Sequence, residues 1–303
     1  MNDHRLFTWE PITSQAFVLG NTFRYGTGVL HHTLTDTMDS ARNVLQFFTN
    51  SAHSVPVFEA LDDGVTTGSA LADRTGASRA TVARILDEGE SRGWIDSEGS
   101  RYELTTKGTI TLEAVRDSLQ TIEGIEHLGE AITWLPAPTR DLDYRLFREA
   151  EIITGRRANP TEPFDFVSDR IRTADRIRTL AWTGVPRLTE LINEQAIAGQ
   201  LECEAVMKAS FFDTLVGRPE VVPHWRAPAE RDEVWRYEGD VPISLHIIDG
   251  TVIIWLDERR GDELVVQGAL VTESRTVLSW AESLYEEYRA GAELVDPATL
   301  PET

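Results

Sequence analysis

The feature that most constrains this chain is the stretch 66–87, TTGSALADRTGASRATVARILD, which reads as two short helices joined by a tight turn. Thr67 is placed to cap the first helix, because its hydroxyl can accept a bond from an early backbone amide. Gly76 falls just past the end of that helix, where a left-handed backbone is easily adopted. Ser78 caps the second helix, whose apolar stripe is formed by Val82, Ile85 and Leu86. This spacing predicts a helix-turn-helix, the motif that places its second helix in the DNA major groove.

Two short strand patterns follow the second helix. Residues 94–96 form a short strand pattern, residues 101–104 alternate in polarity, and the turn sequence SEGS lies between them. The segments RGWI and YELTTKG resemble the RGxI and YxLTxxG run of winged helix-turn-helix regulators. The sequence therefore predicts a winged helix-turn-helix domain over 38–135, including a linker helix. The alternative is a small helical domain used only for packing.

Residues off the apolar stripe of the second helix are predicted to face DNA. Arg79 and Arg84 can each make bidentate contacts to guanine or grip a phosphate. Arg101 lies in the predicted wing, beside the DNA backbone or the flanking minor groove. The complete predicted DNA-binding set is Thr67, Ser78, Arg79, Thr81, Val82, Arg84, Arg101 and Lys107.

The net charge is unusual for a protein that binds DNA. The 303 residues include 29 Lys and Arg against 50 Asp and Glu, a net charge of −21, whereas a basic surface is typical of DNA-binding proteins. Residues 66–110 hold six basic and seven acidic groups, so nearly all of the excess lies elsewhere. Abundant acid with only two lysines resembles proteins of salt-accumulating archaea, since the Debye length falls to ~3 Å in molar salt. The competing interpretation is an acidic protein that never touches nucleic acid.

The sequence gives no sign of secretion or of a membrane. It contains no run of 18 apolar residues and no secretory signal at its start, so we expect a cytoplasmic protein without a membrane partner. Cys203 is the single cysteine, which excludes an intramolecular disulfide. Residues 1–37 lack a sustained apolar period and are expected to be a loose arm or a mis-annotated extension. The adjacent His31 and His32 are not expected to form a metal site.

A second domain is predicted after the linker signal PAPTRD at 136–141. Helix and strand patterns alternate over 140–296, and Asp249-Gly250 predicts a type I′ hairpin turn. This order predicts an α/β domain with a mixed sheet flanked by helices, so the whole chain is α+β, with a tail at 297–303. The intervening helix, predicted over 109–135, is either a homodimer seam or packs on its own domain.

Two C-terminal segments carry a family resemblance. PISLHIIDGTVIIWL and LVVQGALVTESRTVLSWAESLYEEYRAGAELV resemble the C-terminal domain of archaeal, including haloarchaeal, winged helix-turn-helix regulators of the methanogenesis and filament-formation type. The resemblance covers roughly 41–296 and implies a transcriptional regulator of double-stranded DNA. This domain type is also similar to a phospholipase D half-domain. The catalytic His-x-Lys motif of that family is missing here, because Ile247 and Ile248 follow His246. A non-catalytic half-domain is therefore expected.

Catalytic and cofactor motifs are not evident in the sequence. We find no Gly-rich phosphate loop, nucleophile elbow or metal-spaced histidine set. His224 and His246 are isolated in the sequence and are expected to be structural. We therefore predict no enzyme activity, no cofactor and no metal. An enzyme or a structural assembly protein built on the C-terminal domain remains the alternative.

A binding site for a small anionic metabolite is predicted in the C-terminal domain. Thr183 and Gly184 follow one predicted strand, and Lys208 and Ser210 follow the next, so both loops should open on the same edge of the sheet. Free amides at a helix start favour an anion there. Trp225 lies in a predicted loop that could cover the site. The alternative is that all five are ordinary loop residues, and the domain then serves only for dimerisation.

Overall fold

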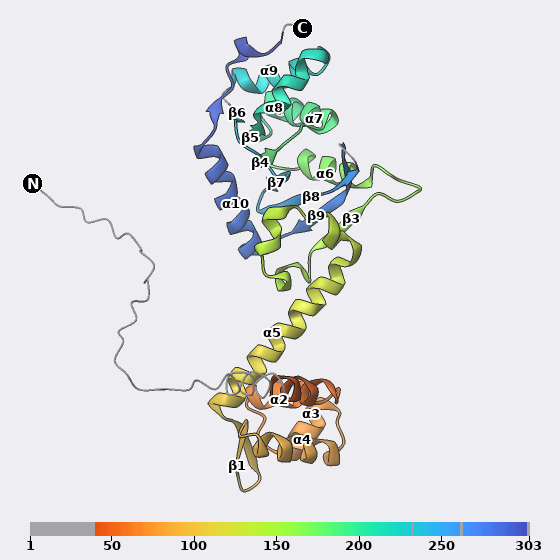
Figure 1. Ribbon diagram of the computed structural model, residues 1–303, viewed down its shortest axis with the longest axis vertical. Helices are drawn as coiled ribbons and strands as arrows, with labels where there is room; N and C mark the ends of the chain where they lie inside the picture. The colour runs from red at the N-terminus through yellow and green to blue at the C-terminus, as the bar shows by residue number, and fades with distance from the viewer. Residues whose placement is uncertain (1–39, 232, 261–262, 302–303) are drawn as a thin grey trace, which may run out of the picture. The chain divides into compact units, whose positions relative to one another are not determined.

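The computed structural model describes residues 40–231, 233–260 and 263–301. The chain divides into two compact units, residues 1–108 and 109–303 (Figure 1), and each is described by itself. The predicted arm at 1–37, with His31 and His32, lies outside the described residues.

The first unit consists of helices followed by a two-stranded hairpin. A helix over 40–49 precedes α2 (Ser54–Asp62), α3 (Gly68–Thr75) and α4 (Arg79–Ser91). The antiparallel strands β1 (Ile95–Glu98) and β2 (Arg101–Leu104) come next, and α5 (Thr106–Leu128) then begins. The two helices, the turn and the hairpin expected over 66–104 are therefore all present.

Local side-chain chemistry fixes the turn between α3 and α4. The Thr67 hydroxyl accepts a bond from the amide of Ala70 at 3.4 Å, and Ser78 accepts one from Thr81 at 3.1 Å. Both are the predicted N-caps, which satisfy backbone donors that a helix start leaves unpaired. Gly76 ends α3 with a φ of 68°, a conformation that is strained for residues with a side chain.

An aromatic cluster fills the core of the first unit. Phe47, Phe48, Phe58 and Trp94 meet with ring centroids between 4.9 and 6.2 Å apart. Val82, Ile85 and Leu86, the predicted stripe of α4, are buried. Burial of such side chains stabilises a fold by about 1.5–3 kcal/mol each, so packing fixes which face of α4 is left exposed.

The second unit is organised around an eight-stranded mixed sheet with the order β10-β6-β5-β4-β7-β8-β9-β3. Its strands are β3 (Glu151–Thr154), β4 (Arg176–Ala181), β5 (Glu202–Lys208), β6 (Val234–Tyr237), β7 (Leu245–Ile248), β8 (Thr251–Arg260), β9 (Glu263–Thr272) and β10 (Glu293–Leu294). Strands β4, β5 and β6 run parallel, and the other neighbours pair antiparallel. The predicted mixed sheet is confirmed.

Helices cover both faces of this sheet (Figure 1). On one face, α10 (Arg275–Ala290) packs its buried Val277, Ala281 and Tyr285 against apolar strand residues. On the other face lie α6 (Glu162–Arg172), α7 (Pro186–Ile197), α8 (Ala209–Asp213) and α9 (Val222–Glu230). Because successive strand residues point to opposite faces, Leu245 of β7 belongs to the α10 side and His246 to the α7 side.

The predicted type I′ turn closes the β7–β8 hairpin. Asp249 and Gly250 both have positive φ, 49° and 87°, as this turn requires. The Asp249 carboxylate also accepts bonds from the amides of Asp175 and Arg176, at 3.0 and 2.9 Å. The turn therefore fixes the start of β4 beside β7.

The division between the units differs from the predicted boundary at 136–141. The predicted linker forms a short 3-10 helix, η2 (Ala137–Asp141), inside the second unit. The C-terminal half of α5 packs within that unit: a ring nitrogen of His127 lies 2.6 Å from the carbonyl oxygen of Ala150. The helix expected over 109–135 is shorter than predicted, because Gly129 follows α5 with a φ of 52°. None of the described helices is long and apolar enough to cross a membrane.

Candidate nucleic-acid interface and ligand pocket

The exposed face of α4 presents two arginines. Arg79 begins the helix and Arg84 lies five residues later, and both are exposed. Arg84 lies 3.8 Å from the Glu88 carboxylate one helical turn away. This ion pair is exposed to solvent and is therefore weak. The described residues provide no ion pair or hydrogen bond for the Arg79 side chain. Within the described part of the chain, Arg79 is thus a cation without a counter-charge at the start of α4.

Other predicted contact residues on α4 have structural roles. Val82 is 1% exposed and packs in the core, so its prediction as a DNA-contacting residue is wrong. The apolar stripe that holds α4 to its unit requires Val82 inside. The hydroxyls of Ser78 and Thr81 lie 2.8 Å apart, and the Ser78 oxygen also caps the helix. These two residues orient the start of α4, next to the exposed Arg79.

The hairpin carries a second free cation. Arg101 is exposed at the start of β2, opposite Glu98 in the strand register. Its side chain makes no hydrogen bond or ion pair with any residue that the structure describes. The backbone of Arg101 bridges to Thr67, and the Tyr102 amide donates to the Thr66 carbonyl at 2.8 Å. The hairpin is therefore attached to the segment that enters α3.

Lys107 is engaged with the end of α4. Its ammonium donates to the carbonyl oxygen of Arg92, the C-cap of α4, at 2.8 Å. A positive charge at this position also stabilises the negative end of the helix dipole. Lys107 therefore contributes to the stability of the unit, whether or not it also contacts a phosphate.

The residues predicted to bind an anionic metabolite do not come together. Thr183, Gly184 and Trp225 line a pocket on the α7 side of the sheet, whereas Lys208 and Ser210 line a different cavity. Met207 points into the pocket, so the next residue of β5 points to the opposite face. The Lys208 ammonium lies 2.6 Å from the Asp240 carboxylate, which compensates its charge. The structure does not assemble the predicted anion site.

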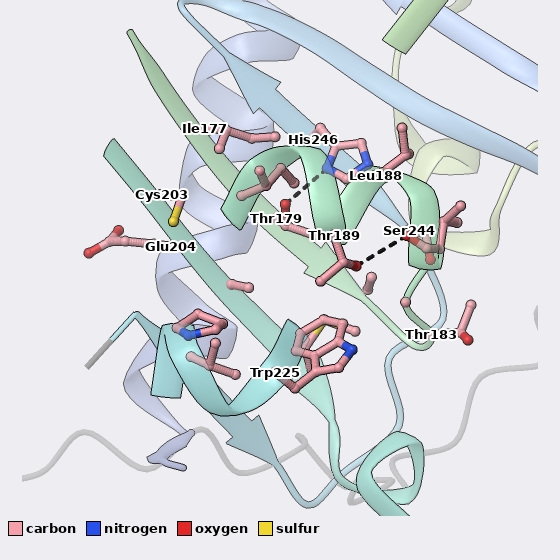
Figure 2. A pocket seen from close by; sticks show the side chains of 18 of the residues that line it. Ile177, Thr179, Thr183, Leu188, Thr189, Cys203, Glu204, Trp225, Ser244 and His246 are labelled. Carbon is pink, nitrogen blue, oxygen red and sulfur yellow. Dashed lines mark hydrogen bonds between the residues drawn. The ribbon is translucent and has the colours of Figure 1, made fainter. Parts of the chain in front are cut away.

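Figure 2 shows the pocket between the sheet and the helices that cover it. Its floor is formed by β4, β5, β7 and β8, and its cover by α7 and α9. Trp225, predicted in a loop, is a buried residue of α9. The pocket extends to the carboxyl ends of the parallel strands β4 and β5, the edge at which open α/β sheets bind ligands. Its walls are mostly apolar and include Ile177, Val185, Leu188, Ile192, Met207, Trp225 and Trp255.

A neutral histidine lies in the floor of this pocket. The Nδ1 atom of His246 lies 2.9 Å from the Thr179 hydroxyl on the neighbouring strand (Figure 2). Full burial lowers the pKa of His246 to about 4, so the imidazole is uncharged at neutral pH. The expectation of a hydrogen-bonded structural histidine agrees with this geometry.

Two polar side chains of the pocket lining, Ser244 and Asp257, have a buried atom without a partner among the described residues, and neither was predicted from the sequence. Ser244 is 6% exposed, and its Oγ has no hydrogen-bond partner among the described residues. Asp257 is bonded to Trp182, but its Oδ1 is buried without a partner in that part of the chain. Burial also raises the pKa of Asp257. The available signal was strand alternation, because Ser244 shares a face with His246, and Asp257 shares one with Trp255.

The opposite end of the pocket is internally satisfied. The Cys203 thiol donates to a carboxylate oxygen of Glu233 at 3.1 Å, and Glu233 pairs with Arg231. Burial beside this carboxylate raises the pKa of the Cys203 thiol to about 12. A thiolate is the reactive form of cysteine, so this group is unreactive at neutral pH.

Two family models match the chain, one in each half. Residues 42–127 match the HVO_A0261 N-terminal domain, and residues 160–291 match the middle domain of the methanogenesis regulatory protein FilR1. These matches confirm the resemblance to archaeal regulators of the methanogenesis type. No curated protein sequence matches the chain.

Similar solved structures include the archaeal chromatin protein TrmBL2, at 15% identity and a TM-score of 0.37, covering 84% of this chain and 98% of that one. NucT from Helicobacter pylori has 10% identity and a TM-score of 0.36, covering 48% and 99%. Bordetella bronchiseptica BpsR has 18% identity and a TM-score of 0.24, covering 41% and 100%. At these TM-scores the likenesses carry no argument about function.

Proposed function

We propose that this chain is a sequence-specific DNA-binding transcriptional regulator. Its first unit acts as a winged helix-turn-helix, with α4 in the major groove and the β1–β2 hairpin as the wing. The observation that carries the proposal is a pair of exposed arginines on these two elements, neither of which has a partner among the described residues. Arg79 lies at the start of α4 and Arg101 on the hairpin, the elements that contact bases and backbone in this motif.

The rigidity of α4 supports this reading. A helix that reads base edges must hold its side chains in a fixed direction, because hydrogen-bond readout depends on geometry. The Ser78 cap, the buried Val82 and Ile85, and the Lys107 bond to the last turn fix this helix at its start, middle and end. Arg79 is therefore presented from an ordered backbone.

The second unit is proposed to be a regulatory domain without catalytic activity. The family model that matches residues 160–291 is named after a methanogenesis regulatory protein. In the phospholipase D-like interpretation, His246 would be the catalytic histidine. It is instead buried, neutral and bonded to Thr179, and Cys203 is protonated. An enzyme remains the alternative, and turnover without DNA would favour it.

A homodimer is part of the proposal. Ile110, Ile122 and Ile125 are exposed on α5, at 60%, 56% and 36%, and large apolar side chains exposed along one helix are typical of association surfaces. A two-fold dimer would place two copies of α4 on half-sites one DNA turn apart.

The test is the binding of purified full-length chain to its own genomic targets, mapped at the native salt concentration and then measured on one bound sequence. Arg79→Ala should weaken binding by ~1–3 kcal/mol and relax the preference at one base position. Arg157→Ala is the matched control, because Arg157 is also an exposed arginine and lies in the second unit. Unchanged affinity and preference in a folded Arg79→Ala protein would remove α4 as the reading helix.

A further inference from the structure

We propose that the pocket between the sheet and helices α7 and α9 binds a small uncharged molecule, with a compact apolar body and a single hydroxyl or N–H group. The site comprises the apolar walls already described, the Ser244 hydroxyl and the Asp257 carboxyl group. It shares Thr183, Gly184 and Trp225 with the predicted anion site but lacks Lys208 and Ser210, and its ligand is uncharged.

The size of the pocket limits the ligand. The space available inside the pocket is about 80 Å³. A dry apolar cavity of about 150 Å³ holds benzene, so this pocket accommodates a smaller body, on the order of five non-hydrogen atoms. Leu188, Ile192 and Trp225 surround that space, and their contacts favour a branched aliphatic group.

An unpaired hydroxyl points to a polar group on the ligand. Ser244 is more than nine-tenths buried, and its Oγ lacks a partner among the described residues. Leaving a buried hydroxyl without a hydrogen bond is costly, and most buried polar atoms in folded proteins are paired. A ligand group that both donates and accepts would satisfy Ser244, and it could also donate to Oδ1 of Asp257.

The charges around the pocket select an uncharged ligand. No lysine or arginine is among its lining residues, whereas Glu204, Glu233 and Asp257 are. The Glu233 carboxylate is already paired with Arg231, so a buried anion would find no cationic partner among the lining residues, which is strongly unfavourable. An ammonium group would lose its hydration among apolar walls, and burial disfavours the ionised form of Asp257, which would be its counter-ion.

The biological role of this pocket rests on the proposed function, whereas the binding of a ligand does not. A ligand between β4, β7 and α9 would make the second unit the sensor of the proposed regulator. The binding itself is measured without DNA. Failure to bind a ligand would therefore leave the DNA-binding proposal intact, and failure to bind DNA would leave the pocket intact.

The test uses three probes with the same carbon skeleton: isobutanol, isobutylammonium and isobutyrate. The full-length ¹⁵N-labelled protein has eight tryptophans, and Trp182, Trp225 and Trp255 line the pocket. Their indole N–H signals, assigned by single Trp→Phe substitutions, report binding directly. Isobutanol should shift these signals in a saturable manner at millimolar concentrations, whereas the two charged probes should bind at least tenfold more weakly.

Three variants distinguish binding of isobutanol in this pocket from a general effect of the alcohol as a co-solvent. Ser244→Ala should weaken isobutanol binding roughly threefold to tenfold, the effect of one hydrogen bond. Ser210→Ala is the matched control, because Ser210 lines the neighbouring cavity. This variant should bind isobutanol as tightly as the wild type does. Ala205→Leu fills the pocket from β5 and should abolish the shifts. Non-saturable shifts, equal binding of isobutyrate, or wild-type affinity in Ser244→Ala would each overturn the proposal.

Discussion

Gly184 packs closely against the indole ring of Trp225: a Cβ atom on residue 184 would be less than 3.0 Å from the ring carbon Cζ2. The turn that follows β4 therefore packs against α9 rather than opening toward an anion. The same absent Cβ would also crowd the ring of Phe211 on α8. Glycine at this position is explained by the close approach of two aromatic rings.

Gly184→Ala should therefore destabilise the second unit. The added methyl group must displace Trp225 and Phe211, and overpacking of this kind costs about 1–3 kcal/mol. Urea unfolding followed by tryptophan fluorescence measures the loss. Gly217→Ala is the control, since a Cβ there meets nothing within 4 Å. Equal stability of the two variants would contradict the packing role of Gly184.

The parts of the fold that could be predicted from sequence depend on local chemistry. Thr67, Gly76 and Ser78 act on their own turn, and Asp249-Gly250 sets its own backbone geometry. Such signals need no knowledge of distant residues. That is why the helix-turn-helix and the hairpin turn were predictable.

The remaining features depend on contacts between distant segments. The pairing of β3 with β9 brings together residues more than a hundred positions apart, and no local pattern encodes it. The loop predicted around Trp225 is a helix, although Pro228 lies inside it, because tertiary packing outweighs local propensity. The anion site was misplaced because Lys208 follows Met207 on a strand, and alternation turns it to the other face.

His246 should give the second unit a pH-dependent stability. The pKa is about 4 in the folded chain and about 6.5 when unfolded, so the unfolded state takes up a proton first as pH falls. The contribution of the neutral His246 to the free energy of unfolding is fully present above pH 6.5, and it is lost as the pH falls from 6.5 toward 4. Lowering pH from 7.5 to 5.5 should cost about 1 kcal/mol through this group.

The comparison that isolates this effect is with His246→Asn, whose amide can still bond Thr179. Chemical denaturation of both proteins at pH 7.5 and 5.5 gives two differences in unfolding free energy. Between pH 7.5 and 5.5, the unfolding free energy of the wild type should fall by about 1 kcal/mol more than that of His246→Asn. An equal fall in both proteins would show that His246 does not carry the effect.

The exposed isoleucines on α5 predict self-association. Ile122→Glu places a charge in the proposed seam, where burial of an unpaired carboxylate is unfavourable, and should shift a dimer toward monomer. Light scattering coupled to size-exclusion chromatography measures the mass. Ile197→Glu is the control, because Ile197 is exposed at 69% on α7 rather than on α5. Identical masses for wild type and Ile122→Glu would exclude α5 as the seam.

The last prediction concerns the free arginine of the hairpin. If Arg101 contacts a phosphate, Arg101→Ala should weaken binding to all sequences alike, because phosphate contacts carry no base information. The slope of log K against log salt should become less steep by about 0.9, the counterion release of one lost contact. Arg157→Ala should leave the slope unchanged.

The negative net charge of the chain should also affect the salt dependence of DNA binding. With a net charge of −21, binding in dilute salt must overcome repulsion from DNA, and salt screens that repulsion as it screens attraction. The full-length protein should therefore lose less affinity between moderate and molar salt than a basic regulator with as many phosphate contacts. Base contacts such as those proposed for Arg79 then supply more of the affinity. A salt slope as steep as that of a basic regulator, or one unaltered by Arg101→Ala, would contradict this account of the interface.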